Sequence, residues 1–252
     1  MTREPLREEE IAGGPVHPGA VWATDGATPP WPVDGLYRKV LAVRDLASGN
    51  SLAAMPAPEE DGESYAATLE ALFIEHGAPL ALKSDKRSCN SEVDALLERY
   101  NVLHLVSPSY TPEYNGAIEA GIGALKTEAH WESARRGHVG QWTSDDLEAA
   151  RRKHNELHRP WGPDQPTPDM VWSSRVPLDD EDRCDFLRTV WAYRNEEMSH
   201  RGVLPGIPLP RKETIAVERI AISRALLDLG YLTIRRRRIA PPFSRPYLRN
   251  IS

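Results

Sequence analysis

Short apolar runs and helical patterns alternate along the first 135 residues of the chain. The apolar runs predict buried strands at Val21–Asp25, Tyr37–Leu46, Asn50–Met55, Ala78–Ser84 and Asn101–Val106. Apolar residues at helical spacing predict three helices, at Glu63–His76, Val93–Tyr100 and Ile118–Ala134. The resulting order, β-β-β-α-β-α-β-α, predicts a mixed five-stranded α/β sheet flanked by helices.

The chain on either side of this region carries weaker patterns. Residues 1 to 17 are polar and contain several Gly and Pro, so a flexible lead-in is expected there. Later helices are predicted at Ser144–Leu157, with Ser144 as the N-cap, at Asp180–Glu197 and at Thr214–Leu229, with a Pro-rich connector at Pro160–Pro168. We therefore expect a lead-in at 1–17, a core at 18–175 and a helical, basic C-terminal region at 176–252.

Charge is distributed unevenly along the chain. The formal net charge is −6, but residues 201 to 252 hold eleven Lys or Arg and three Asp or Glu, a balance of +8 that leaves −14 for residues 1 to 200. Any electrostatic contact with DNA is therefore expected near the C-terminus. The two cysteines, Cys89 and Cys184, lack metal-ligand spacing and are interpreted as reduced thiols. No signal peptide or membrane span is found, so a cytoplasmic location is expected.

Three acidic residues follow strands of the predicted sheet. Asp25 ends the first strand, Asp85 follows the fourth, and Glu119 is expected in the first turn of the helix after the fifth. The first and fourth strands are neighbours in a sheet of this order, so their carboxylates can share a cation. Hard oxygen ligands favour Mg²⁺ or Mn²⁺, and a pair of such ions suits phosphodiester chemistry. A single Asp at a strand end is more often a cap or turn residue, so the prediction rests on all three acids together.

The motifs around these acids resemble a known family. Val21-Trp22-Ala23-Thr24-Asp25, Leu82-Lys83-Ser84-Asp85 and the segment from Ser107-Pro108 to Asn115-Gly116-Ala117-Ile118-Glu119 are similar to the three acidic motifs of DDE-type integrases and transposases, retroviral integrases and bacterial insertion-sequence transposases among them. Downstream, Asn155, Arg159-Pro160 and Thr167-Pro168 resemble the end of that family's core. The resemblance covers roughly residues 18 to 175 and implies a ribonuclease-H-like fold. It also implies metal-dependent DNA cleavage and strand transfer, as in DNA integration, recombination or transposition of a mobile element.

The resemblance also implies residue roles and partners. Asp25, Asp85 and Glu119 would be the catalytic ligands of two Mg²⁺ or Mn²⁺ ions. DNA contacts are expected from Asn115, Lys126, Lys86, Arg87, Arg235, Arg236, Arg237 and Arg238. Lys126 follows Glu119 by seven residues, which puts both on one face of a helix, although a solvated surface lysine fits equally. The four arginines fit a solvated charge run or pairing with acidic residues as well.

Family members commonly carry an N-terminal helix-turn-helix region, and about 17 residues precede this core. Recognition of transposon ends is therefore expected to need a separate helix-turn-helix chain, or the chain is a truncated remnant. Assembly as a homo-oligomer on transposon ends and target DNA is expected, at the nucleoid of a prokaryote. Packing roles are expected for all seven tryptophans except Trp31, and surface positions for His154 and His158.

Three other functions stay open. Lys86-Arg87 stands where the family has Asn-Gly after the second acid, so the chain fits a catalytically inactive DNA-binding remnant as well. A nuclease of the same fold would cut DNA without joining it. Glycoside hydrolysis by paired carboxylates is disfavoured, because three acids are aligned and no sugar-binding aromatic platform is evident.

Overall fold

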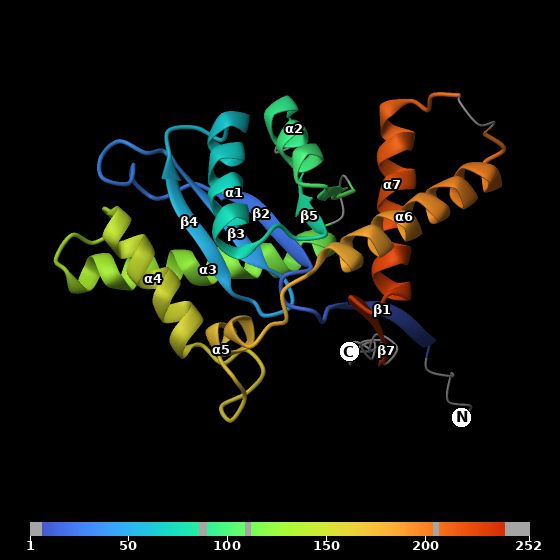
Figure 1. The fold of residues 1–252 in the computed structure, drawn as a ribbon. Coiled ribbons are helices and arrows are strands. Elements are labelled where there is room, and N and C mark those ends of the chain that lie inside the picture. The colour runs from blue at the N-terminus through green and yellow to red at the C-terminus, as the bar shows by residue number, and fades with distance from the viewer. Residues whose placement is uncertain (1–6, 86–89, 109–111, 204–206, 240–252) are drawn as a thin grey trace, which may run out of the picture.

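A five-stranded mixed sheet forms the centre of the protein (Figure 1). The computed structural model describes residues 7–85, 90–108, 112–203 and 207–239. The strands of this sheet are β2 (Val21–Ala27), β3 (Lys39–Asp45), β4 (Ser51–Ala57), β5 (Ala81–Ser84) and β6 (Leu103–Val106), in the order β4-β3-β2-β5-β6. β2 pairs antiparallel with β3 and parallel with β5, and β3 and β4 are antiparallel while β5 and β6 are parallel. The predicted order of strands is therefore confirmed.

Helices cover both faces of this sheet, which explains why its strands are apolar almost throughout. The helices are α1 (Gly62–His76), α2 (Ser91–Arg99), α3 (Pro112–Arg135), α4 (Ser144–Leu157), α5 (Pro168–Ser173), α6 (Asp180–His200) and α7 (Arg211–Asp228). Neighbouring residues of β2 point to opposite faces. Trp22 packs with α1, α2 and Trp172 of α5, whereas Ala23 packs with α3 and α4.

The start of α3 and the N-cap of α4 differ from the prediction. α3 begins at Pro112, so Glu119 is its eighth residue and the expectation that it lies in the first turn is wrong. Pro suits a first helical position, and burial of Ile118 and Ile122 against the sheet outweighs the low helix propensity of Gly116. The N-cap of α4 is Thr143, which forms a capping box with Asp146, and not Ser144 as predicted.

The C-terminal helices share a core with the sheet. Phe186 of α6 and Ile222 and Leu226 of α7 pack with Val21 of β2 and Leu105 of β6. Residues of the predicted C-terminal region therefore help to bury the edge of the sheet that carries β5 and β6. Within the described residues, no helix is long and apolar enough to cross a membrane.

A second, two-stranded sheet joins the beginning of the chain to its end. β1 (Arg7–Pro15) pairs antiparallel with β7 (Leu232–Ile239), beside the lower part of α7 in Figure 1. A flexible lead-in was expected over β1, and its strand partner lies more than 200 residues away, beyond the reach of local patterns. The Cα register runs from Arg7 opposite Ile239 to Pro15 opposite Leu232, with an irregularity between Ala12 and Gly14.

Candidate active site

Asp25 lies in the middle strand of the sheet, close to other carboxylates. It is half-buried near the end of β2, and its Oδ1 accepts a 2.8 Å hydrogen bond from the Gly26 N–H. Burial raises the pKa of the Asp25 carboxyl, and the Gly26 hydrogen bond opposes this increase. Repulsion from Asp85, Glu60 and Glu119, in that order, raises the pKa of Asp25 further. All three of these carboxylates therefore lie within electrostatic range of Asp25.

The parallel pairing of β2 and β5 sets the position of Asp85. Val21 pairs with Ala81 and Ala23 with Lys83, an offset of sixty positions in the chain. Asp85 directly follows β5, and continuing this offset by two residues brings Asp85 level with Asp25. Neighbouring strands lie about 4.8 Å apart. The backbone register therefore places these two acids side by side at the carboxyl end of β5.

Glu119 approaches the other two acids from α3. Ile118 and Ile122 on this helix are buried against the sheet, and Glu119 is exposed beside them. Its effect on the pKa of Asp25 is the smallest of the three carboxylates. Glu119 therefore belongs to the same electrostatic neighbourhood, at its solvent side.

The three predicted ligands do not form a finished coordination sphere. Among the described residues, no group of three His, Cys, Asp or Glu side chains is arranged to hold a metal ion. The donor chemistry does fit a hard divalent cation, because the carboxylates that repel one another around Asp25 carry only oxygen donors. The metal site stays a prediction.

Sequence reasoning missed a fourth carboxylate, Glu60. The Glu60 carboxyl occupies the space that a Cβ on Gly26 would fill, one residue from Asp25. It forms an ion pair with Lys39 at 3.1 Å, and Lys39 Nζ also donates a 3.2 Å hydrogen bond to Thr28 Oγ1. Glu60 lies between β4 and α1 in the acidic run Glu59-Glu60-Asp61, and no motif or spacing in the sequence singles it out.

The residues proposed to contact DNA have different positions. Lys126 is half-buried on α3, two helical turns after Glu119. Asn115 belongs to α3 and Arg235–Arg238 to β7, but their side chains lie outside the described part of the structure, as do Lys86 and Arg87 altogether. The DNA contacts of these seven residues therefore remain predictions.

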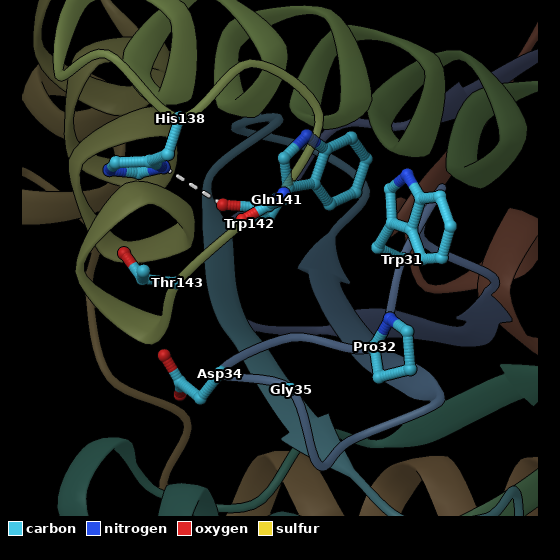
Figure 2. A pocket seen from close by; sticks show the side chains of 8 residues that line it. All are labelled: Trp31, Pro32, Asp34, Gly35, His138, Gln141, Trp142 and Thr143. Carbon is cyan, nitrogen blue, oxygen red and sulfur yellow. Dashed lines mark hydrogen bonds between the residues drawn. The ribbon is translucent and has the colours of Figure 1, made fainter.

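Two adjoining pockets lie along the loop that follows β2, the first against the loop between α3 and α4 and the second against α3 itself. The first, of about 430 Å³, is shown in Figure 2, where Trp31 and Pro32 face Trp142 and Thr143. Asp34 lies on its floor, where its carboxylate accepts hydrogen bonds from the Ser144 hydroxyl and N–H. The second, of about 490 Å³, shares Trp142 with the first and is lined by Thr28, Pro29, Pro30, Lys126, Thr127, His130 and Trp131.

Several aromatic and histidine predictions are wrong. Trp131, Trp161 and Trp191 are exposed, although packing roles were expected for them; exposure of Trp31 agrees with its expected position in a loop. His154 is buried, although a surface position was expected. Trp131 and Trp191 lie on α3 and α6, whose apolar periodicity is weak, so the sequence pattern does not fix which way they face. Trp161 lies in the loop between α4 and α5, and His154 is buried by its contact with the Gly49 carbonyl.

Comparison with known proteins gives matches in structure alone. No protein-family model matches the chain, and no curated protein matches it. A chain of the simian T-cell lymphotropic virus intasome in complex with PP2A regulatory subunit B56 gamma superposes with a TM-score of 0.58 at 17% identity over 71% of this chain and 64% of that one. The HTLV-2 integrase catalytic core domain in complex with magnesium, in a trimeric form, gives a TM-score of 0.50 at 17% identity over 62% of this chain and 98% of the domain.

These matches show the fold. The chain has the ribonuclease-H-like fold of retroviral integrase catalytic cores, as the sequence motifs predicted. It spans about 64% of the length of the intasome chain that it matches.

Proposed function

We propose that this chain is a metal-dependent polynucleotidyl transferase that cleaves DNA strands and transfers the cut ends to target DNA. The observation that supports the proposal is the parallel register of β2 and β5, which pairs Ala23 with Lys83 and, continued one residue past the end of β5, sets Asp85 level with Asp25. The integrase core fold supports it, since the HTLV-2 core that shares this fold is described in complex with magnesium.

The proposed reaction has two in-line displacements at phosphorus. In the first, water attacks a phosphodiester, the P–O3′ bond breaks and a free 3′-hydroxyl is released. In the second, this hydroxyl attacks a phosphodiester of the target strand, a new P–O3′ bond forms and the target's own 3′-oxygen leaves. A pair of Mg²⁺ or Mn²⁺ ions would supply positive charge to the attacking and leaving oxygens.

The residues of the chain hold and position the reactants in this proposal. Asp25 and Asp85 would hold the cations, and Glu119 would complete the ligand set from α3. Lys126 contacts the DNA backbone beside these acids, while Asn115, Lys86, Arg87 and Arg235–Arg238 add further DNA contacts. Because two DNA ends are joined to one target, the chain acts as a homo-oligomer on DNA, with a separate helix-turn-helix chain for end recognition.

Metal binding tests this proposal directly. We expect titration with Mn²⁺, followed by calorimetry, to show saturable binding that is lost in Asp85→Asn and weakened in Glu119→Gln. Glu75→Gln is the matched control, since Glu75 is an exposed glutamate on α1. Mn²⁺ affinity that is the same in all four proteins would refute the proposed metal site.

Two rival functions separate in DNA assays. A plain nuclease would cut labelled DNA but fail to join pre-cut ends to a target. An inactive remnant would bind DNA and neither cut nor join it. The remnant deserves a test because no group of three ligands in the described residues is ready for a metal. Mg²⁺-dependent strand transfer that disappears in Asp85→Asn would exclude both.

A further inference from the structure

The second pocket lies beside the proposed active site without belonging to it. We propose that it binds an unpaired nucleobase of a DNA end, with the base against Trp131 and the neighbouring phosphate at Lys126. This inference rests on the proposed function, since it names part of the DNA that the site would receive. Of the residues that line this pocket, only Lys126 has a role in the proposed function.

On both walls of the pocket, a lining residue follows one of the proposed catalytic acids along the same segment of the chain. On one wall, Thr28 follows Asp25 by three residues, directly after the end of β2 at Ala27. On the other wall, Lys126 follows Glu119 by seven residues, which is about 10 Å along the axis of α3. A strand whose phosphate lies at the acids therefore has its next nucleotides at the mouth of this pocket.

The walls suit a flat, largely apolar ring. Pro29 and Trp142 are buried and line the inside, and Trp131 stands at the mouth with 65% of its surface exposed. Aromatic faces take up bases of any sequence by stacking, and about 490 Å³ lies within the range of small-ligand pockets.

The charge at the rim suits the phosphate that accompanies a base. Lys126 forms no ion pair with any residue that the structure describes, whereas Lys153 and Arg135 nearby are paired with Glu128 and Glu132 of α3. Its ammonium group is therefore available to an anion from outside this part of the chain. The first pocket has Asp34 on its floor instead, and a carboxylate there disfavours a phosphate.

Exposed tryptophans of equal accessibility provide the test. Trp131 and Trp191 are both 65% exposed, and Trp191 lies on α6 outside either pocket. Binding of a blunt duplex and of a duplex with a three-nucleotide single-stranded end is measured by fluorescence anisotropy in EDTA. The unpaired end carries 2-aminopurine, whose fluorescence is quenched when it stacks on an indole. Circular dichroism of each variant shows that its fold is intact.

The expected result separates the two tryptophans. Trp131→Ala weakens binding of the single-stranded end by roughly 5- to 160-fold, which corresponds to the 1–3 kcal/mol typical of one base–aromatic stack, and removes the quenching. The same substitution leaves blunt-duplex binding unchanged, and Trp191→Ala changes neither. Lys126→Ala weakens the binding of both DNAs. It also lowers the magnitude of the slope of log affinity against log salt concentration by about 0.7–0.9, the value for one phosphate contact.

Contrary results have distinct meanings. If Trp131→Ala binds the single-stranded end and quenches its 2-aminopurine fluorescence as the wild type does, the nucleobase-binding proposal is refuted. The proposed catalytic function would still stand. If Trp131→Ala instead changes the oligomeric mass in light scattering and leaves DNA affinity intact, the pocket binds protein, which also overturns the inference. If the wild type binds neither DNA, this inference and the proposed function fail together.

Discussion

His154 provides a measurable link between burial and pH-dependent stability. It lies on α4 with 7% of its surface exposed, and its Nε2 faces the Gly49 carbonyl oxygen at 3.4 Å. Burial, followed by the nearby charges of Arg44 and His158, lowers the pKa of His154 to about 4 from an ordinary 6.5. The hydrogen bond to Gly49 and the charge of Glu128 act in the opposite direction and are weaker.

The sign of the effect follows from this lowered pKa. Above pH 6.5 the ring is neutral in both the folded and unfolded chains, so it contributes no pH dependence. Between pH 6.5 and 4 the unfolded chain binds a proton that the folded chain excludes, so the free energy of unfolding falls as the pH falls. The loss is about 2 kcal/mol at pH 5 and at most about 3 kcal/mol at pH 4.

Urea denaturation followed by tryptophan fluorescence measures this loss in wild type and His154→Gln from pH 7.5 to 4.5. Glutamine keeps an N–H for the Gly49 carbonyl and does not titrate in this range. Between pH 7.5 and pH 5, the free energy of unfolding of His154→Gln should therefore fall by about 2 kcal/mol less than that of the wild type. His200 is exposed at the end of α6, so His200→Gln serves as the control, and its free energy of unfolding should change with pH as that of the wild type does. Parallel profiles for wild type and His154→Gln would refute the reasoning.

Three further perturbations follow from described contacts. Asn155→Ala should lower the free energy of unfolding by about 2–3 kcal/mol in urea denaturation, because Asn155 exchanges hydrogen bonds with the Ser51 backbone and buried Asn50. Phe186→Ala should cost about 3–5 kcal/mol and lower one cooperative transition of the whole chain, since its ring is fully buried; two separate transitions would show that α6 and the sheet unfold independently. Glu60→Gln should lower the pKa of the Asp25 carboxyl in a carbon-13 NMR titration, and an unchanged pKa would remove Glu60 from the site.

Burial on both faces made the central sheet predictable. All five strands are apolar runs, and the structure places each within a few residues of its predicted range. The first and fourth of the predicted strands, β2 and β5, are neighbours in the sheet, as the sequence prediction required. Asp25 and Asp85 were therefore expected to lie close together. The motif residues at the end of the core have structural roles of the same kind, since Asn155 joins α4 to β4 and Thr167 caps α5.

Contacts between distant segments were not predictable. The β1–β7 sheet needs a partner from the other end of the chain, and α5 is a single short helix in a Pro-rich stretch. Glu60 reaches Gly26 only because the loop after β4 folds back over β2. His154 is buried because the turn at Gly49 lies over α4. In each case the contacting residue lies too far away in the sequence to be found from local periodicity.

The three acids differ for the same reason. The relation of Asp25 to Asp85 is a property of the backbone: strand order makes β2 and β5 neighbours, and their register sets the two acids level. The relation of Glu119 to both depends on how α3 is rotated, and burial of Ile118 and Ile122 turns that helix so that Glu119 stays exposed. Among the described residues no three such side chains are arranged to hold a metal ion, and under the proposed function the exposed Glu119 side chain would lose conformational entropy on becoming the third ligand. Under the proposed function, Asp85→Asn should therefore weaken Mn²⁺ binding more than Glu119→Gln, and the reverse order would show that the register of β2 and β5 does not define the site.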